Sequence, residues 1–334
     1  MQILTLFTKI FQFFPEEFSH FISLNSLKIF HQLGILKFIV KDDSARIKKP
    51  TENILDTSNQ LGIAAGLDKN GDYIDCLGSL GIAFIEVGTV TPRPQSGSPK
   101  PRLFRFKQNK SLVNRMGFNN KGVDYIVNRL KERNTLIKVG TSIGKNYDTP
   151  NEKAHEDFVY CMQKVYPYSD YLAINISSPN TKGLRQLSTK SYLNSLLKIL
   201  KDTQRELATS CGYKPIFVKI SPDESYENIA LICESIVTNE IEGIICTNTT
   251  VHHQVGIDSG GLSGSPLKNK STEILKLVKQ IVGNKVALIA SGGVMSADDF
   301  QEKISSGADL VQIYSGLIFE GPKLIGEILD SIES

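Results

Sequence analysis

The 334-residue sequence predicts a (β/α)8 barrel with an α-helical extension at its N-terminus. Eight short apolar runs recur along the chain, as expected for parallel strands that are buried on both faces. Most of the runs end in glycine or a polar residue, and most are followed by a helix-like stretch. The runs span residues 63–66, 83–88, 136–140, 172–176, 216–220, 243–246, 286–290 and 310–313. Two connections, 90–115 and 248–270, are longer than ordinary loops and are expected to act as lids or binding elements.

Composition and charge narrow the class of protein. Hydrophobic residues make up 40% of the chain and charged residues 22%, which is typical of a globular domain with a full core. The net charge is only +3 and no dense basic stripe occurs, so nucleic acid is not an expected partner. The five cysteines are scattered without CxxC spacing, and the histidines show no ligand spacing with them. We expect free thiols in a reducing compartment, no metal site and a monomeric protein.

The first forty residues differ from the rest of the chain. They contain half of the sixteen phenylalanines, spaced along two helix-like stretches that are separated at Pro15. Polar residues interrupt both stretches too often for a helix that spans a bilayer. One interpretation is a helical cap that closes the bottom of the barrel. The other, which we favour, is a pair of amphipathic helices lying in a membrane interface. Residues 41–50 are polar and suit a linker, which divides the chain into an extension, 1–50, and a barrel domain, 51–334.

Helix-capping residues occur where the barrel requires helices to begin or end. Residues 149–152 read Thr-Pro-Asn-Glu, a capping box with proline at the first helical position. Ser271 and Thr272 are expected to begin a helix that ends at Gly283. Residues 296–299 repeat the capping pattern before the last βα unit.

Glycine-rich turns follow the last two predicted strands. Residues 291–293 read Ser-Gly-Gly and residues 314–316 read Tyr-Ser-Gly, at the position where barrels commonly hold a phosphate group. Gly264 is a third candidate, because glycine lets backbone N–H groups approach phosphate oxygens without a side chain in the way. Each glycine taken singly is equally well explained as a turn residue.

Lysines and asparagines also gather at the strand ends. Lys69 and Lys219 follow or end predicted strands, and a lysine that points into a barrel mouth is costly unless it pairs with an anion. Asparagines recur on separate loops at positions 114, 175, 180 and 248. An amide both donates and accepts hydrogen bonds, which suits a small ligand with carboxylate, carbonyl and ring N–H groups. Surface ion pairing and turn formation are the alternatives for any one of these residues.

Seven segments together resemble the quinone-dependent, membrane-associated (class 2) dihydroorotate dehydrogenases. They are AAGLDKNGD (64–72), EVGTVTPRPQSGSPKPRLFR (86–105), NRMGFNNKG (114–122), NISSPNTKGLR (175–185), TNTT (247–250), GGLSG (260–264) and YSG (314–316). The resemblance runs from about residue 10 to the C-terminus. It implies an FMN flavoprotein that oxidises dihydroorotate to orotate in pyrimidine biosynthesis. A quinone would accept the electrons, and the enzyme would be peripheral on the cytoplasmic face of the inner membrane.

The matching motifs imply individual roles. Ser178 would remove the C5 proton of dihydroorotate, where soluble relatives use cysteine, and Thr181 with a water would carry the proton away. Lys219 would stabilise negative charge on the reduced flavin. The resemblance places FMN against Ala65, Gly66, Lys69, Thr89, Ser142, Asn175, Lys219, Thr247, Gly264, Gly293, Tyr314 and Ser315. It places the substrate against Lys69, Asn114, Arg115, Met116, Gly117, Phe118, Asn175, Asn180, Asn248 and Thr249.

Three further residues complete the resemblance. His20 and Arg105 match positions at the inner end of a quinone tunnel formed by the N-terminal helices, with Tyr314 between the tunnel and the flavin. Ser142 is a departure, because the family usually has asparagine there, so its contact with the flavin amide would be shorter or water-mediated. The rival interpretations are a soluble FMN barrel that uses fumarate or NAD, and a catalytically silent barrel bound to membranes.

Overall fold

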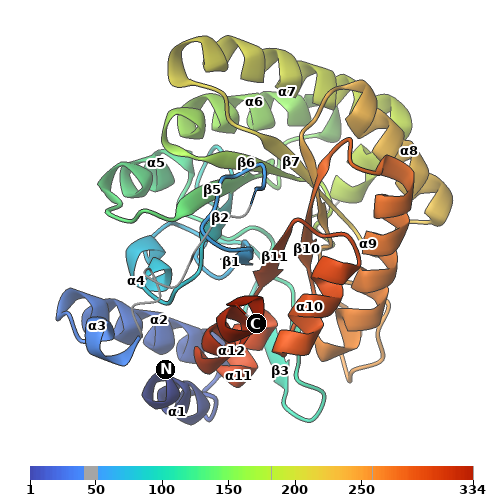
Figure 1. Cartoon of the computed structure of the whole chain (residues 1–334). Coiled ribbons are helices and arrows are strands. Elements are labelled where there is room, and N and C mark those ends of the chain that lie inside the picture. The colour runs from blue at the N-terminus through green and yellow to red at the C-terminus, as the bar shows by residue number, and fades with distance from the viewer. Residues whose placement is uncertain (41–51, 182, 258, 334) are drawn as a thin grey trace.

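The computed structural model describes residues 1–40, 52–181, 183–257 and 259–333. Its centre is a closed barrel of eight parallel strands in the order β1-β11-β10-β8-β7-β6-β5-β2 (Figure 1). The strands are β1 Leu61–Ile63, β2 Phe84–Val90, β5 Lys138–Ile143, β6 Tyr171–Asn175, β7 Ile216–Ile220, β8 Gly243–Cys246, β10 Ala287–Ser291 and β11 Leu310–Ile313. Each predicted apolar run therefore corresponds to one barrel strand, and the predicted fold class is confirmed.

Two strands lie furthest from the positions that the sequence predicts. β1 ends at Ile63, where the predicted run began, and β5 starts at Lys138 and continues to Ile143. Leu136, the first residue of the run predicted for β5, is fully exposed. Hydropathy misplaced β5 because its second half contains Thr141 and Ser142, which are buried by pairing with β2 and β6. Strand ends depend on the partners in the sheet, which hydropathy does not reveal.

Helices surround the barrel and bury one apolar stripe each against it (Figure 1). They are α4 Ile74–Gly78, α5 Val123–Glu132, α6 Ala154–Val165, α7 Lys190–Cys211, α8 Tyr226–Thr238, α9 Lys268–Val282, α10 Ala297–Ser305, α11 Ser315–Glu320 and α12 Lys323–Glu333. Short 3-10 turns lie at Asn151–Lys153, Tyr166–Tyr168, Leu184–Ser188 and Ser265–Leu267.

Two of the predicted helix ends are confirmed and two predicted starts are wrong. Ser296 Oγ accepts a hydrogen bond from Asp299 N at 3.1 Å, and Gly283 ends α9 with a φ of +58°. α9 begins at Lys268 rather than at Ser271, because the 3-10 turn over Ser265–Leu267 leads directly into it. Residues 149–152 form no side-chain cap, since a 3-10 turn precedes α6 there.

The lower half of the barrel interior is filled by large side chains. Three aromatic side chains point inward from the first or second residue of their strands, namely Phe84, Tyr171 and Phe217. Leu55 packs against this layer. Gly140 makes room for this layer, because a Cβ there would lie 2.0 Å from Cζ of Tyr171. The interior is therefore a packed core at the bottom, and the C-terminal ends of the strands leave space for a ligand.

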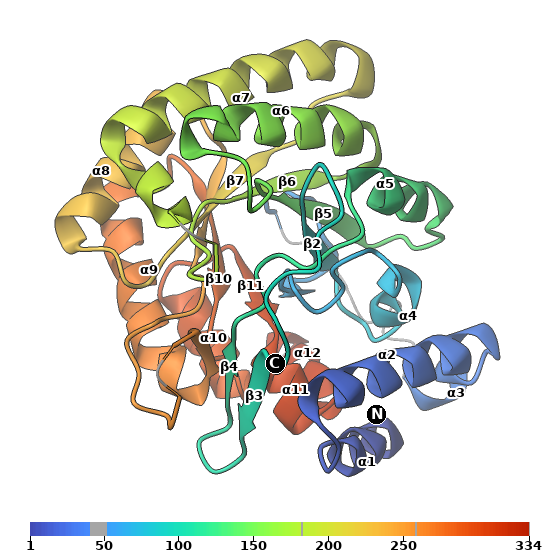
Figure 2. The ribbon, with the colours of Figure 1, turned by 180° about the vertical axis from the view of Figure 1, so that it is seen from behind.

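The two long insertions form one structural unit. β3 Leu103–Phe106 and β4 Ser111–Asn114 lie in the insertion after β2, and β9 Gly261–Gly264 lies in the insertion after β8. The three strands pair antiparallel in the order β3-β4-β9. Figure 2 shows the β3–β4 ribbon extending from the barrel beside α11. Residues far apart in the sequence thus build one wall above the barrel mouth.

The N-terminal extension forms α1 Gln2–Phe11, α2 Glu16–Gln32 and the short α3 Leu36–Ile39. These helices pack against α4, α11, α12 and β3, and both views place them beside α11 and α12 (Figures 1 and 2). The extension therefore packs on the side of the barrel rather than beneath its interior layer, so the bottom-cap interpretation is wrong. None of the helices over the described ranges is long and apolar enough to cross a membrane. The linker predicted at 41–50, and with it the domain boundary, lies outside the described residues.

Candidate functional site

A cavity opens at the C-terminal ends of the barrel strands, and its walls come from the ends of strands such as β6 and β7 and from loops after β1, β2, β6, β8, β10 and β11. Most of the residues predicted from the sequence line it. They are Ala65, Gly66, Lys69, Thr89, Asn114, Met116, Gly117, Phe118, Asn175, Ser178, Asn180, Lys219, Thr247, Asn248, Thr249, Gly264, Gly293, Tyr314 and Ser315. Two separate predictions, for a cofactor and for a substrate, thus converge on one cavity.

Three of the predicted residues lie outside this lining. Ser142 is buried behind Thr89, with the two hydroxyl oxygens 2.9 Å apart, so a contact with a cofactor would run through Thr89 or a water. The Arg115 side chain instead donates to Ser259 O at 2.9 Å and stacks on the ring of Phe104. Thr181 is buried, and its hydroxyl has no hydrogen-bond partner in the described part of the chain.

The four predicted asparagines form two hydrogen-bonded pairs across the cavity. Asn248 donates from Nδ2 to Asn175 Oδ1 at 3.3 Å, and Asn180 donates from Nδ2 to Asn114 Oδ1 at 2.9 Å. Asn175 Nδ2 in turn donates to Thr89 Oγ1 at 2.8 Å. Each pair joins loops from different parts of the chain. Amide groups placed in this way can exchange these mutual hydrogen bonds for hydrogen bonds to a small polar ligand.

Glycine backbones form one end of the cavity. A Cβ at Gly264 would lie 2.2 Å from Lys110 O, and a Cβ at Gly293 would lie 2.3 Å from Lys268 Cα. Both glycines have positive φ angles, +95° and +78°. No side chain is tolerated at either position, so the backbone itself faces the cavity beside Ser315, whose hydroxyl donates to Ser263 Oγ at 2.8 Å. Such a cradle suits phosphate oxygens.

Lys69 brings a cationic group to the cavity. Its Nζ donates to Gly66 O at 2.9 Å, and burial lowers the pKa of its ammonium group to about 8. The neighbouring Asp68 carboxylate holds the loop by accepting the backbone N–H groups of Asp72 at 2.9 Å and Tyr73 at 2.7 Å. Burial raises the pKa of Asp68 to about 6. The loop is thus fixed by its own side chain and presents Lys69 to the ligand.

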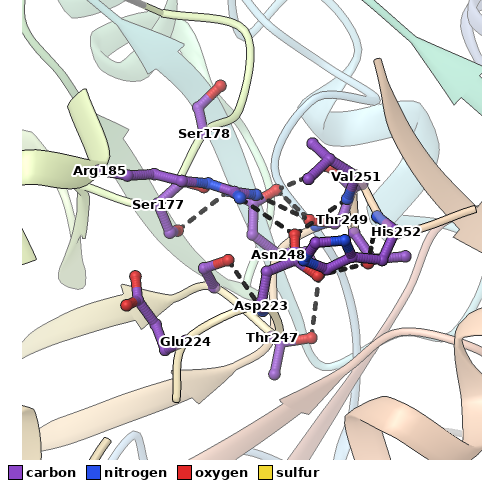
Figure 3. A network of polar contacts seen from close by, with 12 residues as sticks. Ser177, Ser178, Arg185, Asp223, Glu224, Thr247, Asn248, Thr249, Val251 and His252 are labelled. Atoms are coloured by element: carbon purple, nitrogen blue, oxygen red, sulfur yellow. Dashed lines mark hydrogen bonds and ion pairs between the residues drawn. The ribbon is translucent and has the colours of Figure 1, made fainter. Parts of the chain in front are cut away.

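An ion pair that sequence reasoning missed braces the loop carrying Ser178 (Figure 3). Arg185 Nη1 lies 3.0 Å from Asp223 Oδ2, and its Nε donates to Ser177 O at 3.2 Å. Its Nη2 also donates to Thr249 O at 3.4 Å. The loops after β6, β7 and β8 are therefore joined at one point. In the sequence, the one indication that Arg185 braces these loops is its place at the end of the 175–185 motif.

Ser177 and Ser178 face different surroundings. In Figure 3 the hydroxyl of Ser177 points toward Asn248, which donates to it at 3.0 Å, whereas the hydroxyl of Ser178 points away from this cluster. Ser178 Oγ accepts a hydrogen bond from Asn180 N at 3.3 Å and lines the cavity. Of the two adjacent serines, Ser178 is the one whose hydroxyl is available to a ligand.

A second, mostly apolar cavity lies between α1, α2 and the base of the β3–β4 ribbon. His20 and Arg105 both line it. Burial, reinforced by the charge of Lys69, lowers the pKa of His20 to about 3, so its imidazole is neutral at physiological pH. Arg105 donates from Nη2 to Phe14 O at 2.8 Å, while its Nη1 is buried without a hydrogen-bond partner in the described structure.

The two cavities share a thin wall. Gly66 lines the central cavity and the next residue, Leu67, lines the apolar one. In the same way, Tyr314 lines the central cavity, and Ile318, one helical turn later, lines the apolar one. A molecule in the apolar cavity would therefore be separated from the central cavity by little more than one layer of side chains.

The fold and the site define a class: a (β/α)8-barrel enzyme with a phosphate-type cradle, converging amides and an adjoining apolar cavity. A family model described as dihydroorotate dehydrogenase matches residues 52–334. Proteins named dihydroorotate dehydrogenase (quinone) from Acinetobacter baylyi and Saccharophagus degradans are each 45% identical to the chain, over 97% and 95% of both sequences respectively. The chain belongs to the dihydroorotate dehydrogenase family.

A solved structure supports the same assignment. The chain resembles DHODH from Eimeria tenella in complex with ferulenol, with a TM-score of 0.84 and 32% sequence identity. The alignment covers 96% of this chain and 91% of that one, so it includes the N-terminal helices as well as the barrel.

Proposed function

We propose that this protein oxidises (S)-dihydroorotate to orotate with FMN as its cofactor and a quinone as electron acceptor, in de novo pyrimidine biosynthesis. The observation that carries the proposal is the pairing of a polar cavity with an apolar one across the wall at Gly66–Leu67. A polar substrate and a lipophilic acceptor can then use the same cofactor from two sides. The names of the relatives over nearly their full length support the same reaction.

The asparagine pairs and Lys69 would bind the substrate. The amides of Asn114, Asn175, Asn180 and Asn248 match the ring carbonyl and N–H groups, and would exchange their mutual hydrogen bonds for bonds to the ligand. Lys69 supplies a positive charge for the carboxylate of dihydroorotate, an anion at neutral pH. Bound in this way, the ring would lie against Ser178.

Ser178 would act as the base. Its Oγ takes the proton from C5 of the ring, and because an unassisted serine is a poor base, the proton must pass onward. Thr181 is a reasonable relay through a water, since its hydroxyl is buried and has no partner in the described structure. The C5=C6 double bond forms as the proton leaves C5 and a hydride leaves C6.

The residues present fit FMN. Gly264, Gly293 and Ser315 would hold the phosphate, because two of these positions admit no side chain, and Thr89, Asn175 and Thr247 would face the ring system. FMN, when bound, supplies the two-electron chemistry by accepting the hydride from C6. Lys219 would hold a positive charge where negative charge accumulates, and its side chain is nearly fully buried, which strengthens that interaction.

The apolar cavity would receive the quinone. The neutral imidazole of His20 and the free N–H of Arg105 Nη1 are donors suited to quinone oxygens, in a cavity otherwise lined mainly by leucines and phenylalanines. The extension also exposes the rings of Phe13, Phe21 and Phe38. We infer that these side chains insert into the headgroup region, so that the protein is peripheral on the cytoplasmic face of the inner membrane.

The test is a visible absorption spectrum of the purified protein. A flavin spectrum that bleaches with anaerobic dihydroorotate and returns on adding a quinone, but not fumarate or NAD, supports the whole proposal. A colourless protein would refute FMN as the cofactor and would favour a catalytically silent barrel. Reoxidation of the flavin by fumarate or NAD would refute the proposal that a quinone is the electron acceptor.

A further inference from the structure

A buried carboxylate lies directly beneath the central cavity. Glu86 is the third residue of β2 and is fully buried. Phe84, two residues earlier, belongs to the packed interior layer, whereas Ile85 and Val87 pack outward against the helices. Because side chains alternate along a strand, Glu86 also points into the barrel. The proposed reaction as described above leaves this residue without a role.

Glu86 contacts three other inward-facing residues with polar groups, namely Gln312, Lys219 and Tyr171 through its hydroxyl. Its Oε2 accepts a hydrogen bond from Gln312 Nε2 at 2.9 Å, and its Oε1 lies 3.7 Å from Lys219 Nζ. Oε1 of Glu86 and Oε1 of Gln312 are both buried without a hydrogen-bond partner in the described structure. Gln312 also lines the cavity above. A carboxylate is costly to bury unless it is paired, so Lys219 and Glu86 stabilise each other's charge.

The same contact limits the charge that Lys219 offers to the cavity. Ionised Glu86 opposes the positive potential of Lys219 at the cofactor, and in a medium of low polarity such a charge acts over several ångströms. Removing the negative charge would leave the ammonium uncompensated. Reduction of the flavin adds negative charge, so it would become more favourable.

We propose that Glu86 is a positioning residue that holds Lys219 and lowers the midpoint potential of the bound flavin. This inference rests on the proposed function. The lowered potential balances two demands: the flavin must accept electrons from dihydroorotate and must still give them up to the quinone. Glu86 acts on both half-reactions through Lys219, without touching the substrate.

The test compares three variants of the full-length protein with its flavin bound. Glu86→Gln keeps the shape and the hydrogen bond to Gln312 but removes the charge. Glu86→Asp keeps the charge and draws it back from Lys219. Glu242→Gln is the matched control, because Glu242 forms a buried ion pair with Lys201 away from the cavity. The measurement is the midpoint potential by equilibrium dye titration, followed by the rates of the two half-reactions in stopped flow.

Glu86→Gln is expected to raise the equilibrium constant for flavin reduction at least tenfold, which is about 30 mV for a two-electron couple. Reduction by dihydroorotate should become faster and reoxidation by quinone slower. Glu86→Asp should shift the potential in the same direction by a smaller amount, and Glu242→Gln should leave it unchanged.

The possible results distinguish a failure of the proposed function from a failure of the role of Glu86. A wild-type protein that binds no flavin refutes the proposed function itself. A flavin-loaded Glu86→Gln variant with an unchanged or lowered potential overturns the role of Glu86 while leaving the proposed function intact. If Glu86→Gln does not retain flavin, the midpoint potential of Glu86→Asp is the test. An unchanged potential in that variant also overturns the role of Glu86.

Discussion

Replacing Ser178 with alanine separates catalysis from stability at one position. The Ser178 side chain is buried, yet within the described ranges its Oγ takes part in one hydrogen bond, which it accepts from Asn180 N at 3.3 Å. Loss of so long a bond should lower the free energy of unfolding by about 0.5–1 kcal/mol. The cavity walls and the glycine cradle are untouched, so FMN should remain bound.

The effect on turnover should be much larger. A positioned general base contributes about 10²- to 10⁴-fold to a rate. At about 1.36 kcal/mol per factor of ten, this corresponds to about 3–5 kcal/mol of the activation free energy. The expected loss in catalysis therefore exceeds the expected loss in stability several-fold. Ser178→Cys should also be poorly active, because the cavity is shaped around a hydroxyl.

Stopped-flow absorbance measures the two half-reactions separately. Bleaching of the flavin by dihydroorotate should slow by at least 10²-fold in Ser178→Ala, and reoxidation by quinone should be unaffected. Ser177→Ala is the matched control and should slow bleaching by less than tenfold, since it removes the hydrogen bonds of the Ser177 hydroxyl with Asn248 and Asn175 but leaves the hydroxyl of Ser178 in place. Bleaching within tenfold of wild type in Ser178→Ala would refute the assignment of the base.

Three further perturbations test other parts of the structure. The Lys69 ammonium has a pKa of about 8, and only its charged form attracts the substrate carboxylate, so KM for dihydroorotate should rise as pH increases through 8. Gly140→Ala would place a methyl 2.0 Å from the ring of Tyr171, and overpacking of this kind should cost about 1–3 kcal/mol, measured by chemical denaturation. Phe13→Ser combined with Phe38→Ser removes two exposed rings from the extension and should weaken flotation with phospholipid vesicles while leaving bleaching by dihydroorotate intact.

Each of these has a control and a contrary result. Lys69→Arg should move the rise in KM above pH 9, and a flat wild-type profile to pH 9 would contradict the role of the charge. Gly326→Ala, in α12 with open space at the added methyl, should be neutral or stabilising by up to about 1 kcal/mol. Leu136→Ser removes an exposed apolar side chain that is not part of the extension and should not change flotation. Equal flotation of all variants would count against membrane insertion of the phenylalanines.

The barrel itself was predictable because a parallel strand buried on both faces must be apolar over its whole length. The ends of β5 were not, because Thr141 and Ser142 are polar and are buried only by pairing with their neighbours. The cavity residues on the strand ends were also predictable in large part, since a closed barrel brings the ends of all its strands together. Arg115 shows the limit of that argument, because adjacent residues on a strand end point in opposite directions.

Contacts between distant parts of the chain could not be foreseen. The ion pair of Arg185 with Asp223 joins two loops, and nothing in the local sequence of either indicates the other. The inward orientation of Glu86 and Gln312 could be predicted from the sequence. Side chains alternate along a strand, so both residues point into the barrel, as Phe84 and Leu310 do two residues earlier. Their contact with each other still depends on the register of strands β2 and β11 around the closed sheet.

The sequence by itself determined the eight-strand barrel, the residue types at its mouth and the two apolar helices ahead of it, because these follow from local periodicity and from matching motifs. Only the tertiary structure decided where those helices pack and that they enclose an apolar cavity against Leu67 and Ile318. It also decided that a buried carboxylate faces Lys219. The physical reason is that hydropathy records whether a side chain prefers burial, whereas the fold decides which partner it is buried against.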